Sequence, residues 1–292
     1  MLLPKFYGKT ISIAGLCKNA GKTTLLNEII RQYDNPLAIT SIGLDGETKD
    51  SVTGTSKPRI YIHKDTIFAT AADTLIDCDC TREILHTFDI NTPVGTIAAV
   101  RALSDGYIKI AGASTVNELI TIRDYFLSLN IERVLIDGAL SRISNASAKL
   151  CDSIALCTGA ALSADMREVI YKTAYEAMLL SLPQAEENEK CNYLYGAVTD
   201  KALIEEVKKA KEPSVFVAED NSKLLISPSV YNMLIKSGHK LKVKKTIKLC
   251  LITINPYSPK GLNFNPDEFL YRMRESIPSD IPIADIHRDI IL

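Results

Sequence analysis

The sequence predicts an α/β fold: a doubly wound, mainly parallel sheet of the P-loop NTPase type, with β-hairpin insertions and an α/β C-terminal portion. Two patterns predict it. Short apolar runs rich in β-branched residues alternate with amphipathic helical runs over most of the chain, which is typical of a parallel sheet with helices on both faces. In addition, one apolar run leads through a glycine- and lysine-containing loop into a helix, and a later run ends in aspartate.

The N-terminal part predicts two strands around one helix. Residues 9–15 (KTISIAG) form a β-branched apolar run that ends in glycine, as a buried strand would. Residues 22–33 place apolar side chains at helical spacing, and the Asp-Asn-Pro that follows ends the helix. Residues 37–43 (LAITSIG) predict a second strand. The polar stretch 44–58 has no hydrophobic period, so we expect a mobile or functional loop there.

Two hairpins and a short helix are predicted next. The apolar segments 59–63 and 66–71 are separated by Lys-Asp and are interpreted as one hairpin. Segments 95–103 and 107–112 flank Ser-Asp-Gly and are interpreted as a second hairpin. Between the hairpins, residues 81–88 (TREILHTF) are expected to form a short helix.

Helices and strands continue to alternate beyond this region. The segment 114–130 predicts a helix, and Thr115 followed by Glu118 has the spacing of a capping box. Two strands and a long helix follow, at 133–138 (RVLIDG), 152–159 (DSIALCTG) and 163–182.

The polar, proline-containing stretch 183–191 is the best internal boundary. We therefore expect residues 1–182 to form a nucleotide-binding domain with a hairpin insertion at about 44–112. Residues 183–292 are expected to form an α/β C-terminal extension, either a separate unit or a continuation of the same sheet.

Composition excludes several classes of function. The 34 Lys and Arg residues nearly balance 35 Asp and Glu residues, so the net charge of −1 gives no argument for a nucleic-acid partner. The basic run 239–248 alternates with apolar residues, as in a strand with one solvated face. No signal peptide or membrane-spanning run is present, and the seven cysteines have no disulfide-rich layout, so we expect a cytoplasmic protein. Cys78 and Cys80 favour semi-buried thiols near a helix start over a metal site, because no second cysteine pair or clustered histidines lie nearby.

Residues 15–24 (GLCKNAGKTT) are interpreted as the phosphate-binding motif G-x-x-x-x-G-K-[ST], with Gly15, Gly21, Lys22 and Thr23 as its defining residues. The predicted strand before it and helix after it are the context that this motif requires. A glycine-rich turn that simply leads into a helix is the structural alternative.

The chemistry of a phosphate loop assigns a role to each residue type. Backbone N–H groups of the curled loop point at phosphate oxygens, and the helix N-terminus adds partial positive charge. Lys22 is the predicted catalytic contact to the β- and γ-phosphates, and the Thr23 hydroxyl is a predicted Mg²⁺ ligand. The predicted nucleotide-binding set is Gly15, Lys18, Asn19, Ala20, Gly21, Lys22, Thr23 and Thr24. For Lys18, a solvated position is an equal alternative.

Two aspartates are candidates for the acidic side of the site. Asp137 ends the apolar run RVLID, which is the Walker B pattern, and we expect it at the Mg²⁺ site; capping of the following turn is its alternative. Asp45 follows the second strand and is the predicted catalytic residue that orients water or supports the metal. Its alternative is ordinary Asp-Gly turn chemistry, and Glu47 is a weaker substitute.

The identity of the nucleotide base is predicted only from a motif that the sequence lacks. Guanine-specific GTPases of this fold carry N-K-x-D after a late strand, whereas residues 157–162 (CTGAAL) contain neither that lysine nor that aspartate. We therefore expect ATP, with GTP less favoured. Asn255 and Pro256 follow a late strand where a base could rest, although a loop turn is the simpler interpretation.

At GLCKNAGKTT, ITSIGLDGE, RVLIDGAL and INPYSP, the chain resembles the P-loop subunit of the lysine 5,6-aminomutase reactivating factor family, which is encoded beside the aminomutase in lysine-fermenting bacteria. The likeness covers most of the chain. The P-loop alone is common to many families, whereas its combination with TSIG-x-DGE and DGAL is more specific. Ser141 departs from the family's acidic residue, which weakens a catalytic role for the loop after Asp137.

The resemblance implies an ATP-hydrolysing reactivase. Its client is the adenosylcobalamin-dependent aminomutase, its partner is a second ATPase subunit of the mismatch-repair MutS type, and hydrolysis releases damaged cobalamin. The γ-phosphate and Mg²⁺ would hold the loop around Asp45 in one state and hydrolysis would relax it. Two alternatives stay open: a small-molecule ligase of the dethiobiotin synthetase class, and a subunit that binds nucleotide without hydrolysing it.

Overall fold

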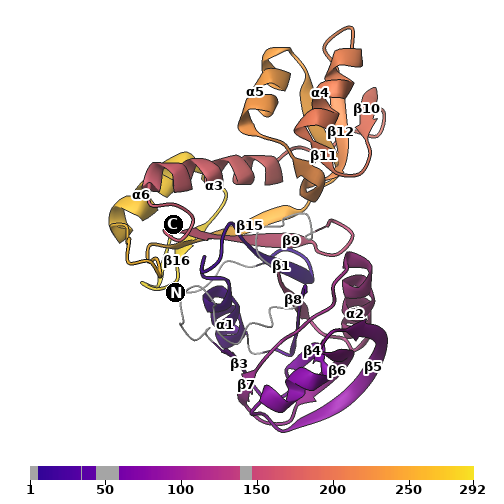
Figure 1. Ribbon diagram of the computed structural model, residues 1–292, viewed down its shortest axis with the longest axis vertical. Coiled ribbons are helices and arrows are strands. Elements are labelled where there is room, and N and C mark those ends of the chain that lie inside the picture. The colour runs from indigo at the N-terminus through magenta and orange to yellow at the C-terminus, as the bar shows by residue number, and fades with distance from the viewer. Residues whose placement is uncertain (1–5, 34, 44–58, 139–146) are drawn as a thin grey trace.

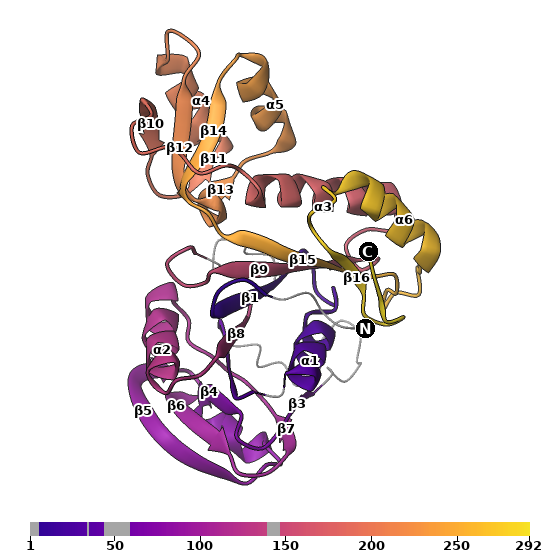
Figure 2. The same cartoon turned by 180° about the vertical axis from the view of Figure 1, so that it is seen from behind.

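The chain folds around a large, mainly parallel sheet with helices on both faces, in the computed structural model shown in Figures 1 and 2. The structure describes residues 6–33, 35–43, 59–138 and 147–292. Ten strands of these residues form the central sheet in the order β17-β16-β15-β9-β1-β8-β2-β4-β6-β5. Neighbours from β16 to β4 are parallel, whereas β17 at one edge and β6 and β5 at the other are antiparallel.

The strands of the central sheet are β1 (Thr10–Gly15), β2 (Leu37–Ser41), β4 (Ile67–Ala71), β5 (Arg82–Thr92), β6 (Gly95–Ala102), β8 (Arg133–Asp137), β9 (Ser153–Gly159), β15 (Lys248–Asn255), β16 (Ile283–Asp285) and β17 (Ile290–Ile291). The inner strands β1, β2 and β9 are buried along their whole length, so their β-branched runs are apolar without alternation.

Helices cover both faces of this sheet. Alternate residues of β1 show the division, because Ile13 belongs to the core on the side of α1 (Lys22–Gln32), while Ala14 belongs to the core beneath α3 (Met166–Leu180) and α6 (Pro266–Ser276). The last helix that covers the central sheet, α2 (Val116–Ser128), packs a third apolar cluster against β2 and β8. The arrangement is that of a doubly wound sheet.

The structure corrects three expectations about residues 59–112. Strand β3 (Ile60–Ile62) pairs with β7 (Gly106–Ile108) in a separate two-stranded sheet, and β4 joins the central sheet, so neither predicted hairpin exists. The residues expected to form a short helix belong to the edge strand β5, which makes the actual hairpin with β6. The two hairpin errors concern strand pairing, which depends on contacts remote in sequence, whereas the third mistook a strand for a helix. The loop 44–58 lies outside the described residues.

A smaller lobe is inserted into the C-terminal half. The chain leaves the central sheet after α3 and rejoins it at β15, so the expected extension 183–292 contains two structural parts. The lobe has a three-stranded parallel sheet, a two-stranded sheet and two helices, which stand apart from the central sheet in Figures 1 and 2. Its elements are β10 (Cys191–Leu194), β11 (Val198–Thr199), α4 (Asp200–Lys209), β12 (Val215–Asp220), β13 (Leu224–Leu225), α5 (Pro228–Lys236) and β14 (Lys240–Lys245).

Asp220 anchors the lobe to the main body. Its carboxylate is fully buried and accepts hydrogen bonds from Ser147 Oγ (3.0 Å) and the Ala148 N–H (3.1 Å) of the main body. The same carboxylate accepts hydrogen bonds from the backbone and hydroxyl of Ser222 in the lobe. The adjacent Asn221 donates from its amide to the Leu179 carbonyl at 2.8 Å. Four donors therefore satisfy one buried carboxylate between the two parts.

Two further sequence predictions are confirmed. Thr115 and Glu118 form the expected capping box at the start of α2. The basic run becomes strand β14, in which Leu241 and Val243 are buried while Lys240 and Lys244 are exposed. Within the described residues, no helix has the length and apolarity that a membrane span requires.

Candidate functional site

The candidate site is the turn that joins β1 to α1. It lies at the carboxyl edge of the central sheet, where ligands bind in open α/β folds. The backbone turns sharply because Asn19 (φ 59°) and Gly21 (φ 96°) both adopt left-handed conformations. Asparagine and glycine are the residues that tolerate this region best, so the local sequence fits the turn that it makes.

Lys22 folds back over this turn instead of extending into solvent. A methyl group added to Gly15 would lie 3.2 Å from the Cγ, Cδ and Nζ atoms of Lys22, so the whole side chain passes across the glycine. Burial raises the pKa of the Cys17 thiol to about 11, and the nearby Lys22 ammonium opposes that rise. The positive charge therefore lies within the curve of the loop, where it can meet an anion.

The spacing of the loop differs from the motif assigned to it. Five residues separate Gly15 from Gly21, whereas G-x-x-x-x-G allows four, so Leu16 occupies the position of the first motif glycine. The Leu16 N–H donates to the Cys157 carbonyl at 2.9 Å, which holds this residue against β9. The glycine at position 15 nevertheless leaves room for Lys22, which an added methyl group would crowd.

Helix α1 begins without a side-chain cap. Its N-cap residue, Gly21, has no side chain that could accept a hydrogen bond from the first turn, and that turn contains no acidic residue. The other five described α-helices begin with a side chain that accepts such a bond, from Thr115, Asp165, Thr199, Ser227 or Asn265. The first N–H groups of α1 are thus available to an external acceptor, as at anion-binding helix termini.

The predicted acidic residue lies on the neighbouring strand at the same edge. Asp137 pairs in register with Ile13 of β1 and with Ser41 of β2. The Gly138 N–H donates to the Ile13 carbonyl at 2.8 Å, and a side chain at Gly138 would lie only 2.7 Å from that oxygen. Close backbone contact therefore fixes the end of β8 beside the turn between β1 and α1. Asp45 and Glu47 lie outside the described residues.

The donor set at this edge suits magnesium better than a cage-bound metal. No group of three or more His, Cys, Asp or Glu side chains forms a metal centre in the part of the chain that the structure describes. Mg²⁺ in nucleotide sites is held by one or two protein oxygens together with phosphate oxygens and waters. Thr23 in the first turn of α1 and Asp137 supply a hydroxyl and a carboxylate of this kind.

Asn255 contacts the loop directly, a role that the sequence did not indicate. Its Nδ2 donates to the Asn19 carbonyl at 3.2 Å, and its Oδ1 accepts from the Tyr257 N–H at 3.0 Å. Its Cβ lies 3.8 Å from the methyl position of Gly21. The side chain therefore braces the left-handed part of the loop. The only sequence signal was its position at the end of an apolar run.

The remaining predicted binding residues surround the same turn. Lys18 and Asn19 are exposed, Ala20 is buried, and Thr23 and Thr24 are partly buried. Ser41, one strand away from Asp137, has a buried hydroxyl oxygen with no hydrogen-bond partner among the described atoms. Burial raises the pKa of Cys157, behind the loop, to about 12, so this thiol stays protonated.

Comparisons with known proteins found no matching family model, no matching curated protein and no matching solved structure.

Proposed function

We propose that this chain binds a nucleoside triphosphate, with Mg²⁺, at the turn between β1 and α1. One combination carries the proposal: an uncapped helix N-terminus beneath a lysine folded over a left-handed loop. Uncapped N–H groups and a positive charge at the same turn suit a polyphosphate. Thr23 and Asp137 hold the metal. ATP is preferred over GTP, because the guanine-specific segment is missing from the sequence.

The proposed reaction is transfer of the γ-phosphoryl group to water. Lys22 stabilises the negative charge that develops on the phosphate oxygens, and electrostatic stabilisation of this kind dominates phosphoryl transfer. Asp45 orients the attacking water; it follows β2, whose end lies beside β8. This assignment rests on the sequence alone, because Asp45 is outside the described residues.

The biological role follows the resemblance stated above and is proposed on that ground. Nucleotide hydrolysis, together with a MutS-type ATPase subunit, drives the release of damaged cobalamin from an adenosylcobalamin-dependent aminomutase. The inserted lobe gives the chain a second body outside the nucleotide fold, which suits a protein that must contact others.

Calorimetric titration of the whole chain with ATP and with GTP tests the first step. We expect saturable heat with ATP in the presence of magnesium, weaker binding with EDTA, and weaker binding of GTP. Lys22→Ala should abolish the signal, while Lys18→Ala, which removes an exposed lysine of the same loop, should reduce it much less. Absence of binding for both nucleotides would disprove the proposal at its base.

Steady-state turnover separates the three roles. For a reactivase, ATP hydrolysis rises when aminomutase inactivated by damaged cobalamin is added with the partner subunit, and inactive cofactor is released. Turnover that requires a small carboxylate substrate instead would assign the chain to the ligase class. Full reactivation by Lys22→Ala would leave only a structural role for the nucleotide.

A further inference from the structure

Strand β10 forms an outer edge of the three-stranded sheet in the lobe. β10 is the terminal strand of the sheet β10-β12-β14 and pairs only with β12 among the described residues. Figures 1 and 2 both place it on the outside of the lobe. We define the β10 edge as residues 191–195 together with the two cavities that flank them.

The two edges of this small sheet are treated differently by the chain. At β14, the opposite edge, the incoming segment of the lobe pairs with the strand: Ala185 donates to the Val243 carbonyl at 2.9 Å, and Val243 donates to the Pro183 carbonyl at 3.1 Å. No described residue pairs with the outer side of β10 in this way. An open edge presents free N–H and C=O groups to another chain, and proteins normally block such edges.

The side chains of the β10 edge do not block it. Tyr193 and Tyr195 are 51% and 90% exposed, so two aromatic rings stand in solvent beside the open strand. Exposed tyrosines are enriched at protein interfaces because they combine apolar area with one polar group. A lysine or proline, the residues that usually protect an edge strand, is missing from residues 191–195.

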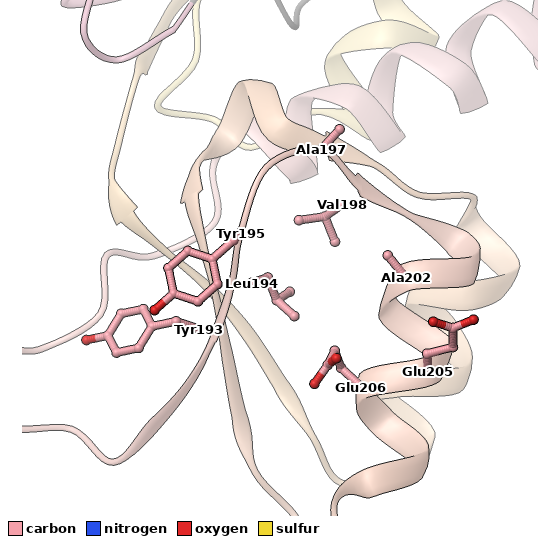
Figure 3. Close-up of a pocket in the computed structure, with 8 residues that line it drawn as sticks. All are labelled: Tyr193, Leu194, Tyr195, Ala197, Val198, Ala202, Glu205 and Glu206. Atoms are coloured by element: carbon pink, nitrogen blue, oxygen red, sulfur yellow. The ribbon is translucent and has the colours of Figure 1, made fainter.

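The first cavity, of about 390 Å³, lies between the end of β10 and helix α4. Figure 3 shows Leu194 and Val198 pointing into this space, while the rings of Tyr193 and Tyr195 lie on the other side of the strand. Ala202 completes an apolar floor, and the carboxylates of Glu205 and Glu206 line the helix side. Among the described residues, none that lines the cavity is basic.

An apolar floor with a carboxylate rim matches one kind of side chain. Lysine and arginine bury an aliphatic stem and keep the charged end near polar groups, so the stem fits Leu194, Val198 and Ala202. The charged end meets Glu205 and Glu206. Glu206 also forms an exposed ion pair with Lys209 at 2.6 Å, which a better-placed cation can replace at small cost.

The second cavity, of about 290 Å³, lies on the opposite face of the same strand. The tyrosine side chains, Val217, Glu219 and Lys244 line it. Successive residues of a strand point to opposite faces, so a chain added beside β10 sends alternate side chains toward the two cavities. Backbone pairing combined with alternate side-chain pockets is the arrangement by which domains capture extended peptides.

We propose that the β10 edge binds an extended segment of a separate partner protein, which pairs with β10 and places a lysine or arginine in the cavity beside α4. The charge of that cavity selects the basic side chain, and the free edge selects the extended backbone. The proposal does not depend on nucleotide binding.

A synthetic peptide of alternating threonine and lysine, added to the full chain, tests the proposal. Fluorescence anisotropy of the labelled peptide should show saturable binding, and amide hydrogen exchange should slow over residues 191–195. Two matched peptides supply the controls. The same peptide with alternate backbone nitrogens methylated cannot pair with a strand, and a threonine–glutamate peptide has the opposite charge; both should bind much more weakly.

Two matched double variants locate the charge effect. Glu205→Gln with Glu206→Gln should weaken the lysine peptide about fivefold, the effect expected of a few exposed charge pairs. Glu186→Gln with Glu187→Gln removes the same charge from adjacent exposed residues of the lobe and should leave affinity unchanged.

Several outcomes would overturn the proposal. One is that both double variants lose the same affinity for the lysine peptide. Another is that the unaltered protein binds the methylated or the acidic peptide as tightly as the lysine peptide. A third is that no saturable binding is seen up to about millimolar peptide, where specific interactions become negligible. A dimer of the full chain that protects residues 191–195 would assign the edge to a second copy instead of a separate partner. The peptide comparisons use the unaltered protein, so they hold even if the first double variant fails to fold.

Discussion

The turn between β1 and α1 and the inserted lobe solve opposite structural problems. At the loop, polar backbone groups are left without side-chain caps but are held in place by neighbours on both sides, from Asn255 and from Gly138. In the lobe, the anchor at Asp220 is fully satisfied by four donors, while the outer strand β10 stays open. Fixed contacts thus surround the turn between β1 and α1 in one region, and the junction with the main body in the other.

This difference in how the backbone groups are held indicates which kind of ligand each region suits. A polyphosphate needs fixed N–H groups, because a loop that must first be ordered loses binding free energy. A peptide that adds to a sheet edge supplies its own hydrogen bonds and needs only an open strand with suitable pockets. The following changes test this division, from the largest expected effect to the smallest.

Lys22→Ala removes the positive charge that is folded over the loop. We expect loss of ATP turnover by about 100-fold or more, since removal of one electrostatic contact to the developing charge commonly costs that much. Steady-state phosphate release measures it. Peptide binding at the β10 edge should be unchanged; a parallel loss there would show that the two regions are not separate.

Asp220→Ala removes the acceptor of four hydrogen bonds, two from the main body and two from Ser222 within the lobe. We expect the free energy of unfolding to fall by about 3 kcal/mol, because buried donors lose a charged partner. Urea denaturation measures it. Glu219→Gln is the matched control: its ion pair with Lys149, at 2.7 Å, is largely exposed, so its loss should cost less than about 1 kcal/mol. Equal effects would contradict the anchor.

Gly15→Ala places a methyl group 3.2 Å from three atoms of the Lys22 side chain. We expect about tenfold weaker ATP binding, since a displaced lysine loses a charge-assisted contact worth roughly that factor, with little change in melting temperature. Gly21→Ala should instead lower stability by about 1 kcal/mol or more, because that residue has a left-handed backbone. Calorimetry and thermal melting distinguish the two. Unchanged affinity in Gly15→Ala would show that Lys22 can move without penalty.

Asn255→Ala removes the brace on the Asn19 carbonyl. One neutral hydrogen bond is worth about 1 kcal/mol, so ATP affinity should fall by about fivefold. Asn255→Asp keeps the shape but replaces the donating amide with a carboxylate, so it should not restore binding. An alanine variant with normal affinity would mean that the loop holds its shape without this contact.

Alkaline pH should weaken the region behind the loop. The pKa values of Cys17 and Cys157 are raised by burial to about 11 and about 12, from an ordinary value of 9.0. A thiol with a raised pKa contributes stability that is complete below pH 9 and lost as pH climbs toward the folded value. Denaturation midpoints should therefore fall between pH 9 and pH 11, and less so in Cys17→Ser. An identical fall in that variant would assign the effect to other groups.

Local features of this chain could be predicted from sequence, because their causes are local. The strand before the loop, the helix after it and the capping box at Thr115 depend on neighbouring residues and were correctly predicted. Asp137 could be placed at the sheet edge because parallel strands end together. The motif count at Gly15 was wrong by one residue, since glycine has other reasons to stand at a strand end.

Strand pairing could not be predicted, because it is decided by contacts between distant segments. Strand β3 pairs with β7 and not with β4, the next strand in the sequence. The Asn27 side chain, on α1, also forms hydrogen bonds with the backbone of Arg59 and Tyr61. Asn255 likewise contacts Asn19 because the central sheet brings distant segments of the chain together. No periodicity in the sequence predicts either contact.

The paired ends of the lobe have a consequence for how this architecture can vary. Residues 183–185 run beside Val243, so the chain enters and leaves the lobe within one hydrogen-bonded ladder. A module whose two ends lie together can gain or lose residues at only a small cost in loop-closure entropy. Such a change does not shift the register of the central sheet. Relatives of this protein are therefore expected to differ in the size of the lobe while the order of the central sheet stays the same.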